Sequence, residues 1–158
     1  MKIIQWIIAL AGLAFGLPAS AQAAQTDPEV IIYRFPGVRD DGNPDGVGVA
    51  TVFHCTNFSG TTENLRLVTR EIFGTLRTNV TTPIQHLNSL AHSTHFTQAY
   101  SGAGASLNTG VVVEGTTAIA ATSINIICTA MVIDAANPKP TGVALRGIRF
   151  SPVPGSQE

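Results

Sequence analysis

The chain has 158 residues and carries few charges, with 9 lysines and arginines against 10 aspartates and glutamates, which gives a formal net charge of −1. No basic patch is visible in the sequence, so nucleic acids and anionic lipids are excluded as expected partners. A chain of this length is long enough to form one domain with its own hydrophobic core.

Residues 1–23 have the pattern of a secretory signal peptide. Lys2 provides the positive start, Ile3–Leu17 is an apolar run, and the small-residue cleavage motif ends at Ala23. The apolar run is shorter than the ~20 residues that span a bilayer, and it stops at Pro18. No second run reaches membrane length, so we expect an exported protein, periplasmic or extracellular, with no transmembrane segment after cleavage.

The rest of the chain, residues 24–158, is expected to be a single domain. It is rich in Thr, Val, Ala, Gly and Asn, a composition typical of strands and turns. Alternating or β-branched runs predict strands at Val30–Phe35, Val47–Thr56, Glu63–Phe73, Thr75–Thr81, Ser93–Tyr100, Val111–Glu114, Thr116–Ala121, Ser123–Asp134 and Val143–Phe150. About 7–9 short strands at this spacing predict an all-β fold, an immunoglobulin-like antiparallel β-sandwich.

Two segments leave the choice between strand and helix open. Glu63–Phe73 also fits a helical stripe, and a strand is favoured because its neighbours are strands. Thr82, Pro83 and Gln85 match a helix start, with a capping threonine, proline in the first turn and a capping-box glutamine. A short helix near residues 82–91 and an irregular strand edge are therefore both compatible with this segment.

The only two cysteines, Cys55 and Cys128, lie on the apolar faces of two predicted strands. In an exported chain a pair of cysteines favours one disulfide over two separate buried thiols. The pairing of an early and a late strand predicts a bridge that crosses the core between facing sheets. Two antibody-type features are missing, because the only tryptophan is Trp6 in the signal peptide and Ile126 stands where a tyrosine is expected.

Three histidines, His86, His92 and His95, lie within ten residues and form a candidate Zn or Cu site. On a strand, His92 and His95 point to opposite faces, so only a helical turn brings them together. The competing interpretation is that they are polar side chains on a strand edge. The fourth histidine, His54, is expected on the solvent face beside Cys55.

Residues 41–46, DGNPDG, match the opening of a calcium-binding loop. The candidate ligands are Asp41, Asn43 and Asp45. The twelfth position is Val52 and not the usual glutamate, so Asp40 or a distant carboxylate has to complete the shell. The alternative interpretation is a hairpin turn built from residues that favour turns.

No paired carboxylates, nucleophile elbow or phosphate-binding loop occur in the sequence, so we expect no enzymatic activity. Apart from the Ca and Zn or Cu candidates above, no cofactor is expected. The sequence favours a structural or interaction module of the bacterial envelope that binds another envelope protein or a second copy of itself. A periplasmic metal-binding protein that uses His86, His92 and His95 is the first alternative, and a small secreted hydrolase is the second.

Overall fold

The structure is a computed structural model, and it describes residues 29–42, 46–102 and 104–150. The predicted signal peptide, Asn43 and Asp45 lie outside these ranges. The strands are β1 (Val30–Asp40), β2 (Val49–Asn57), β3 (Glu63–Glu71), β4 (Leu76–Ile84), β5 (Ser89–Ser93), β6 (Gly104–Ser106), β7 (Val112–Ala121), β8 (Ile126–Asp134), β9 (Gly142–Leu145) and β10 (Ile148–Arg149), with a 3-10 turn η1 at Gln98–Tyr100.

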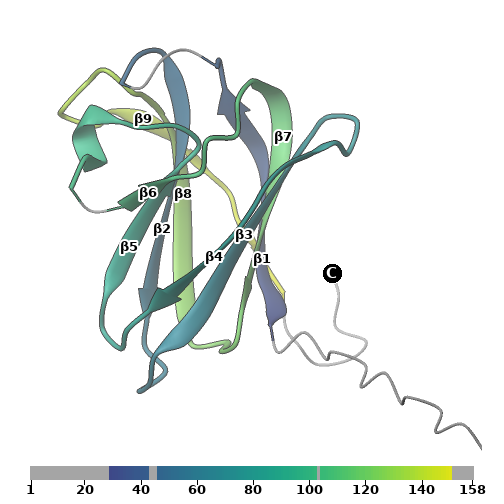
Figure 1. The fold of residues 1–158 in the computed structure, drawn as a ribbon, viewed down its shortest axis with the longest axis vertical. Helices are drawn as coiled ribbons and strands as arrows, with labels where there is room; N and C mark the ends of the chain where they lie inside the picture. Colours follow the sequence, from purple (N-terminus) through teal and green to yellow (C-terminus); the bar gives the residue numbers. More distant parts are fainter. Residues whose placement is uncertain (1–28, 43–45, 103, 151–158) are drawn as a thin grey trace, which may run out of the picture.

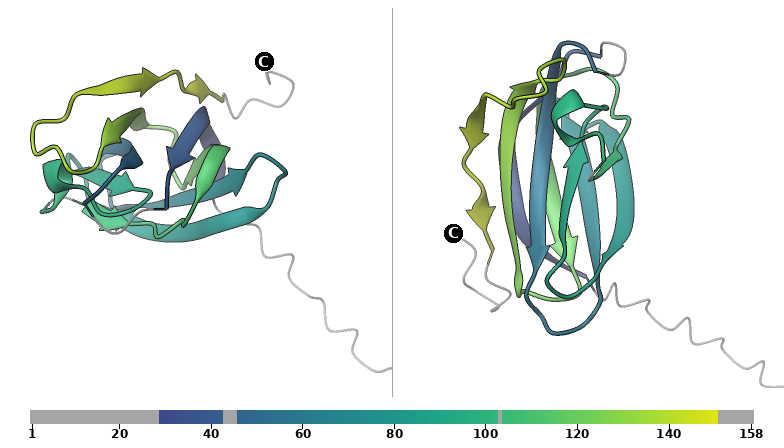
Figure 2. Two further views of the ribbon diagram at one scale, coloured as in Figure 1. Left: turned by 90° about the horizontal axis from the view of Figure 1, so that it is seen from above. Right: turned by 90° about the vertical axis from the view of Figure 1, so that its left-hand side faces the viewer.

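The strands form two five-stranded sheets that pack face to face (Figures 1 and 2). Sheet A has the order β10-β1-β7-β3-β4, and sheet B has the order β6-β5-β2-β8-β9. All pairs are antiparallel except β5 with β6. The last segment passes from β9 in sheet B to β10 in sheet A along one side of the molecule, as Figure 2 shows. The predicted all-β sandwich is confirmed.

The core lies between the two sheets and is built from the inward side chains of alternating strand positions. Phe35 of sheet A and Phe53 of sheet B meet edge to face, with ring centroids 5.8 Å apart. Leu65, Leu67 and Ile119 are fully buried around them. Removing this apolar surface from water is the main favourable contribution to folding.

The β3–β4 hairpin shows whether the two ambiguous segments are strand or helix. β3 is a strand, as favoured, but the short helix near residues 82–91 is wrong. β4 runs on to Ile84, where Asn64 pairs with Pro83 and Glu63 with Ile84. A proline is compatible with β4 because it is an edge strand, whose outer side needs no ladder N–H. Strand pairing therefore overrides the local helix-start pattern.

The first strand is longer than predicted, because Pro36 and Gly37 do not end it. Pro36 pairs with Thr116, and the register shifts between Pro36 and Val38, which is typical of a β-bulge. Gly37 has φ +79°, a conformation that glycine adopts without strain. The bulge lets β1 continue to Asp40.

The predicted strand Ser93–Tyr100 is also wrong. β5 ends at Ser93, and the chain turns into η1, which lies over the outer face of sheet B. There Tyr100 packs with Val52 and Ile133 in a small second cluster. His54 was expected in solvent but is half-buried, with its ring 4.6 Å from that of Tyr100.

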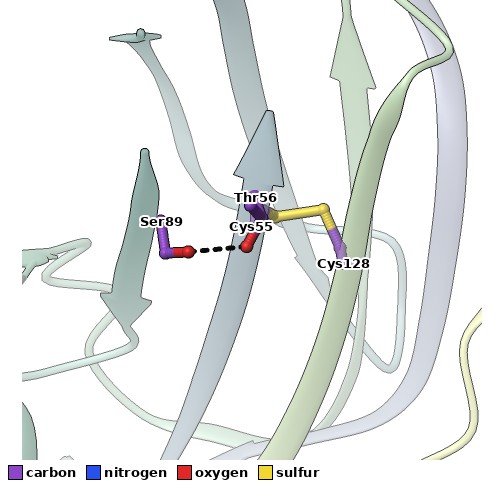
Figure 3. The surroundings of a disulfide bond; sticks show 4 residues. All are labelled: Cys55, Thr56, Ser89 and Cys128. Atoms are coloured by element: carbon purple, nitrogen blue, oxygen red, sulfur yellow. Dashed lines mark hydrogen bonds between the residues drawn. A yellow bond between two sulfur atoms is a disulfide. The ribbon is translucent and has the colours of Figure 1, made fainter. Parts of the chain in front are cut away.

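Cys55 and Cys128 form the expected disulfide, but they do not link facing sheets. They are direct partners on β2 and β8, two neighbouring strands of sheet B. Figure 3 shows the bond between these strands, with a hydrogen bond between the hydroxyls of Thr56 and Ser89 of β5 on the other side of β2. The predicted core-crossing bridge is therefore wrong, because β2 and β8 pair with each other.

Candidate functional site

The structure does not bring the three candidate histidines together. His86 lies in the β4–β5 turn, where its Nδ1 accepts a hydrogen bond from the Gly60 N–H at 3.0 Å. His92 is buried on β5 with its Nε2 3.2 Å from Thr82 Oγ1. Of the three histidines, only His95 belongs to a group of potential metal ligands within the part of the chain that the structure describes.

That group consists of Asp40, Asp41 and His95, whose ligand atoms all lie within 4.8 Å of one another. Asp40 is the last residue of β1, Asp41 follows it, and His95 comes two residues after the end of β5. The group thus joins one candidate calcium ligand to one candidate histidine. Asn43 and Asp45, the other candidate calcium ligands, lie outside the described residues.

Asp40 is a buried carboxylate, only 2% exposed. Its Oδ1 accepts a hydrogen bond from the Gly42 N–H at 2.7 Å. Its Oδ2 accepts a hydrogen bond from Thr109 Oγ1 at 3.0 Å. These two donors fix the carboxylate in one orientation and offset part of the cost of its burial.

His95 lies beside this carboxylate and is 6% exposed. One ring nitrogen, Nε2, is 3.1 Å from the carbonyl oxygen of Val47. The other, Nδ1, is 3.0 Å from Asp40 Oδ2. This second contact lacks the alignment of a hydrogen bond, so Nδ1 is a buried polar atom with no hydrogen-bond partner.

Asp41 is exposed to solvent, in contrast to the other two members of the group. Its Oδ2 accepts a hydrogen bond from the Val49 N–H at 2.8 Å, which ties the end of β1 to the start of β2. Both carboxylates line a cavity of about 480 Å³. The remaining lining residues are Arg39, Val49, Val111, Val112, Val113 and Val132.

Buried threonines hold this end of the sandwich together. Thr51 Oγ1 accepts a hydrogen bond from the Arg39 N–H at 2.9 Å and donates to the Arg39 carbonyl at 2.8 Å. Thr94 Oγ1 accepts from the Thr51 N–H at 3.0 Å. The network connects β1, which carries Asp40, to the segment after β5, which carries His95, through Thr51 of β2. Sequence reasoning missed it, because Thr51 looks like any other inward strand position.

Two other histidines have environments that disfavour their charged form. Burial lowers the pKa of His92 and that of His54. For Glu63, by contrast, the surroundings favour the charged form, because hydrogen bonds from Thr122 and Ser59 lower the pKa of its carboxyl group. None of these three side chains belongs to the Asp40–Asp41–His95 group.

A second feature is the β3–β4 hairpin (Glu63–Ile84), which projects at the upper right of Figure 1. Its tip is a turn closed by a hydrogen bond from the Gly74 N–H to the Glu71 carbonyl. Three apolar side chains at the tip, Ile72, Phe73 and Leu76, are exposed, and Phe73 reaches 91%. Such a cluster is unusual on a surface that contacts only water.

Comparison of the chain with protein-family models, curated proteins and solved structures gave no match. Within the part of the chain that the structure describes, no helix is long and apolar enough to cross a membrane.

Proposed function

We propose that this protein is an exported, non-enzymatic β-sandwich that acts in the bacterial envelope by binding another envelope protein or a second copy of itself. The binding surface is the β3–β4 hairpin. One observation carries the proposal: β4 ends sheet A, and its outer side pairs with no other strand of the described residues. This nine-residue edge continues directly into the exposed apolar tip at Phe73.

An open edge strand presents a row of backbone N–H and C=O groups that an extended segment of a partner can pair with. Soluble proteins commonly protect such edges with lysines, prolines or bulges. β4 has one charged residue, Arg77, which forms an ion pair with Glu71 of the same hairpin. Its proline, Pro83, lies near the end remote from the tip, so most of the edge is free of these protective features.

The disulfide supports export, since such bonds persist in oxidising compartments. It agrees with the signal peptide that the sequence predicts for residues 1–23. The periplasmic metal-binding alternative that uses His86, His92 and His95 loses support, because these residues have separate partners.

Site-specific photo-crosslinking in intact cells that produce the full chain tests the proposal. A photoreactive phenylalanine analogue replaces Phe73 in one variant and Phe58 in the other. Phe58 is a matched control, because it is also exposed and lies in the β2–β3 turn, at the opposite end of β3. We expect a discrete adduct from position 73 and none from position 58.

The size of the adduct distinguishes the two partners, since a second copy doubles the mass and another envelope protein gives a different increment. Absence of an adduct at position 73, or equal adducts at both positions, would refute the hairpin as the binding surface.

A further inference from the structure

In the neutral ring, the contact between His95 and Asp40 brings two lone pairs together, and either a proton on Nδ1 or a metal ion between the two atoms removes this repulsion. The Val47 carbonyl can only accept a hydrogen bond, so the His95 Nε2 at 3.1 Å must carry a proton and donate it. In the neutral ring the other nitrogen, Nδ1, then has a lone pair and no proton. This lone pair faces Asp40 Oδ2, which also has only lone pairs to offer, at 3.0 Å.

A shared proton would relieve the repulsion through a hydrogen bond, but the two atoms are not aligned for one. A metal ion needs no such alignment. Two ligands of a tetrahedral ion, each about 2.1 Å from it, lie about 3.4 Å apart, which is about 0.4 Å more than the 3.0 Å between Nδ1 and Oδ2. The nearby Asp41 carboxylate, within 4.8 Å of both partners, completes three ligands.

We propose that Asp40, Asp41 and His95 bind a divalent transition-metal ion of the Zn²⁺ type. An imidazole nitrogen suits Zn²⁺, whereas Ca²⁺ and Mg²⁺ take oxygen ligands. Two carboxylates balance the two charges of the ion. Three protein ligands leave a fourth position for water, and the cavity that both carboxylates line gives the ion access from solvent.

The surroundings have the features that support metal ligands. A ligating histidine usually donates its other N–H to a carbonyl or carboxylate, as His95 does to Val47. A ligating carboxylate is itself hydrogen-bonded, as Asp40 is by Thr109 and Gly42. The one cationic side chain that lines the cavity, Arg39, is exposed to solvent, where its charge is screened.

Isothermal titration calorimetry with ZnCl₂, on full-length protein stripped with EDTA, tests the site. We expect one ion per chain. Asp41→Asn and His95→Gln each remove a ligand, and Thr109→Val removes a supporting hydrogen bond. Loss of such a support typically weakens metal binding about 10–100-fold, and we expect loss of a ligand to weaken it at least as much. The control, His86→Gln, changes a histidine in the remote β4–β5 turn and should leave the affinity unchanged.

Circular dichroism verifies that each variant folds. If His95→Gln does not fold, Asp41→Asn still tests the site, because Asp41 is exposed. The site is overturned if the wild-type protein takes up no Zn²⁺, or if Asp41→Asn binds as tightly as wild type. A titration with CaCl₂ that gives tighter binding than ZnCl₂ would overturn the transition-metal assignment. None of these outcomes affects the hairpin, so the two proposals fail separately.

Discussion

Cys55 and Cys128 lie directly opposite each other on adjacent strands of one sheet, with their Cα atoms 4.2 Å apart. The bond therefore joins β2 to β8, two inner strands of sheet B. The two sheets are connected by packing, by the chain and by hydrogen bonds such as the pair between Arg39 and Thr51. Its two cysteines are 73 residues apart in the sequence. Closing so long a loop restricts the unfolded chain far more than it alters the folded one.

Replacing both cysteines by alanine should lower the free energy of unfolding by up to about 4 kcal/mol, because the unfolded chain regains the conformational entropy that the bond removes. Urea unfolding followed by circular dichroism measures the change. Wild-type protein treated with a reductant is the control, and it should unfold at nearly the same urea concentration as the double variant. Equal stability of the oxidised and reduced wild type would mean that the bond does not form.

Two phenylalanines separate the effect of burial from that of residue type. Phe53 is fully buried against Phe35, whereas Phe73 is 91% exposed. Phe53→Ala should cost about 3–5 kcal/mol through lost apolar burial and a cavity. Phe73→Ala should change stability by no more than about 0.5 kcal/mol, as is usual at exposed sites. Comparable losses from both substitutions would contradict the packing described.

The buried His92 should make stability depend on pH. Burial lowers its pKa from the ordinary value of 6.5, so the unfolded chain binds a proton at this ring more readily than the folded chain does. The free energy of unfolding therefore falls as the pH drops below about 6.5. His54, whose pKa burial also lowers, contributes with the same sign.

His92→Gln should reduce this dependence between about pH 7 and pH 5, measured by urea unfolding at each pH. The wild-type protein, measured in parallel, gives the reference slope. A variant at His92 with an unchanged slope would show that this ring does not titrate differently in the two states.

Much of the fold could be predicted from the sequence, because periodicity of two is a local signal. The alternation in Val47–Thr56 correctly identified β2 and placed Phe53 and Cys55 on its core face. The errors arose where distant pairing decides the outcome. Pro83 became part of an edge strand through its pairing with β3. The disulfide lies within one sheet because β2 and β8 are neighbours there. Local sequence patterns do not indicate the order of the strands in a sheet.

The candidate metal group was harder to predict, since its members are far apart in the sequence. Asp41 and His95 were each identified, but in two different hypothetical sites. Only the convergence of the end of β1 with the segment after β5 brings them together. Asp40 was named only as a completing ligand, and nothing local to it indicates that it is buried. The sequence does not indicate the exposure of Phe73, which follows from its place in the turn between β3 and β4.

The pairing of a partner with the edge of β4 is the central claim, and two matched substitutions test it directly. Thr81 is exposed on β4, whereas Thr116 is exposed on β7, which has strands on both sides. A lysine on an edge strand disfavours addition of a further strand, but on an inner strand it blocks no edge. The yield of the crosslinked adduct at position 73 should fall several-fold with Thr81→Lys and stay unchanged with Thr116→Lys. An equal yield in both variants would contradict the claim.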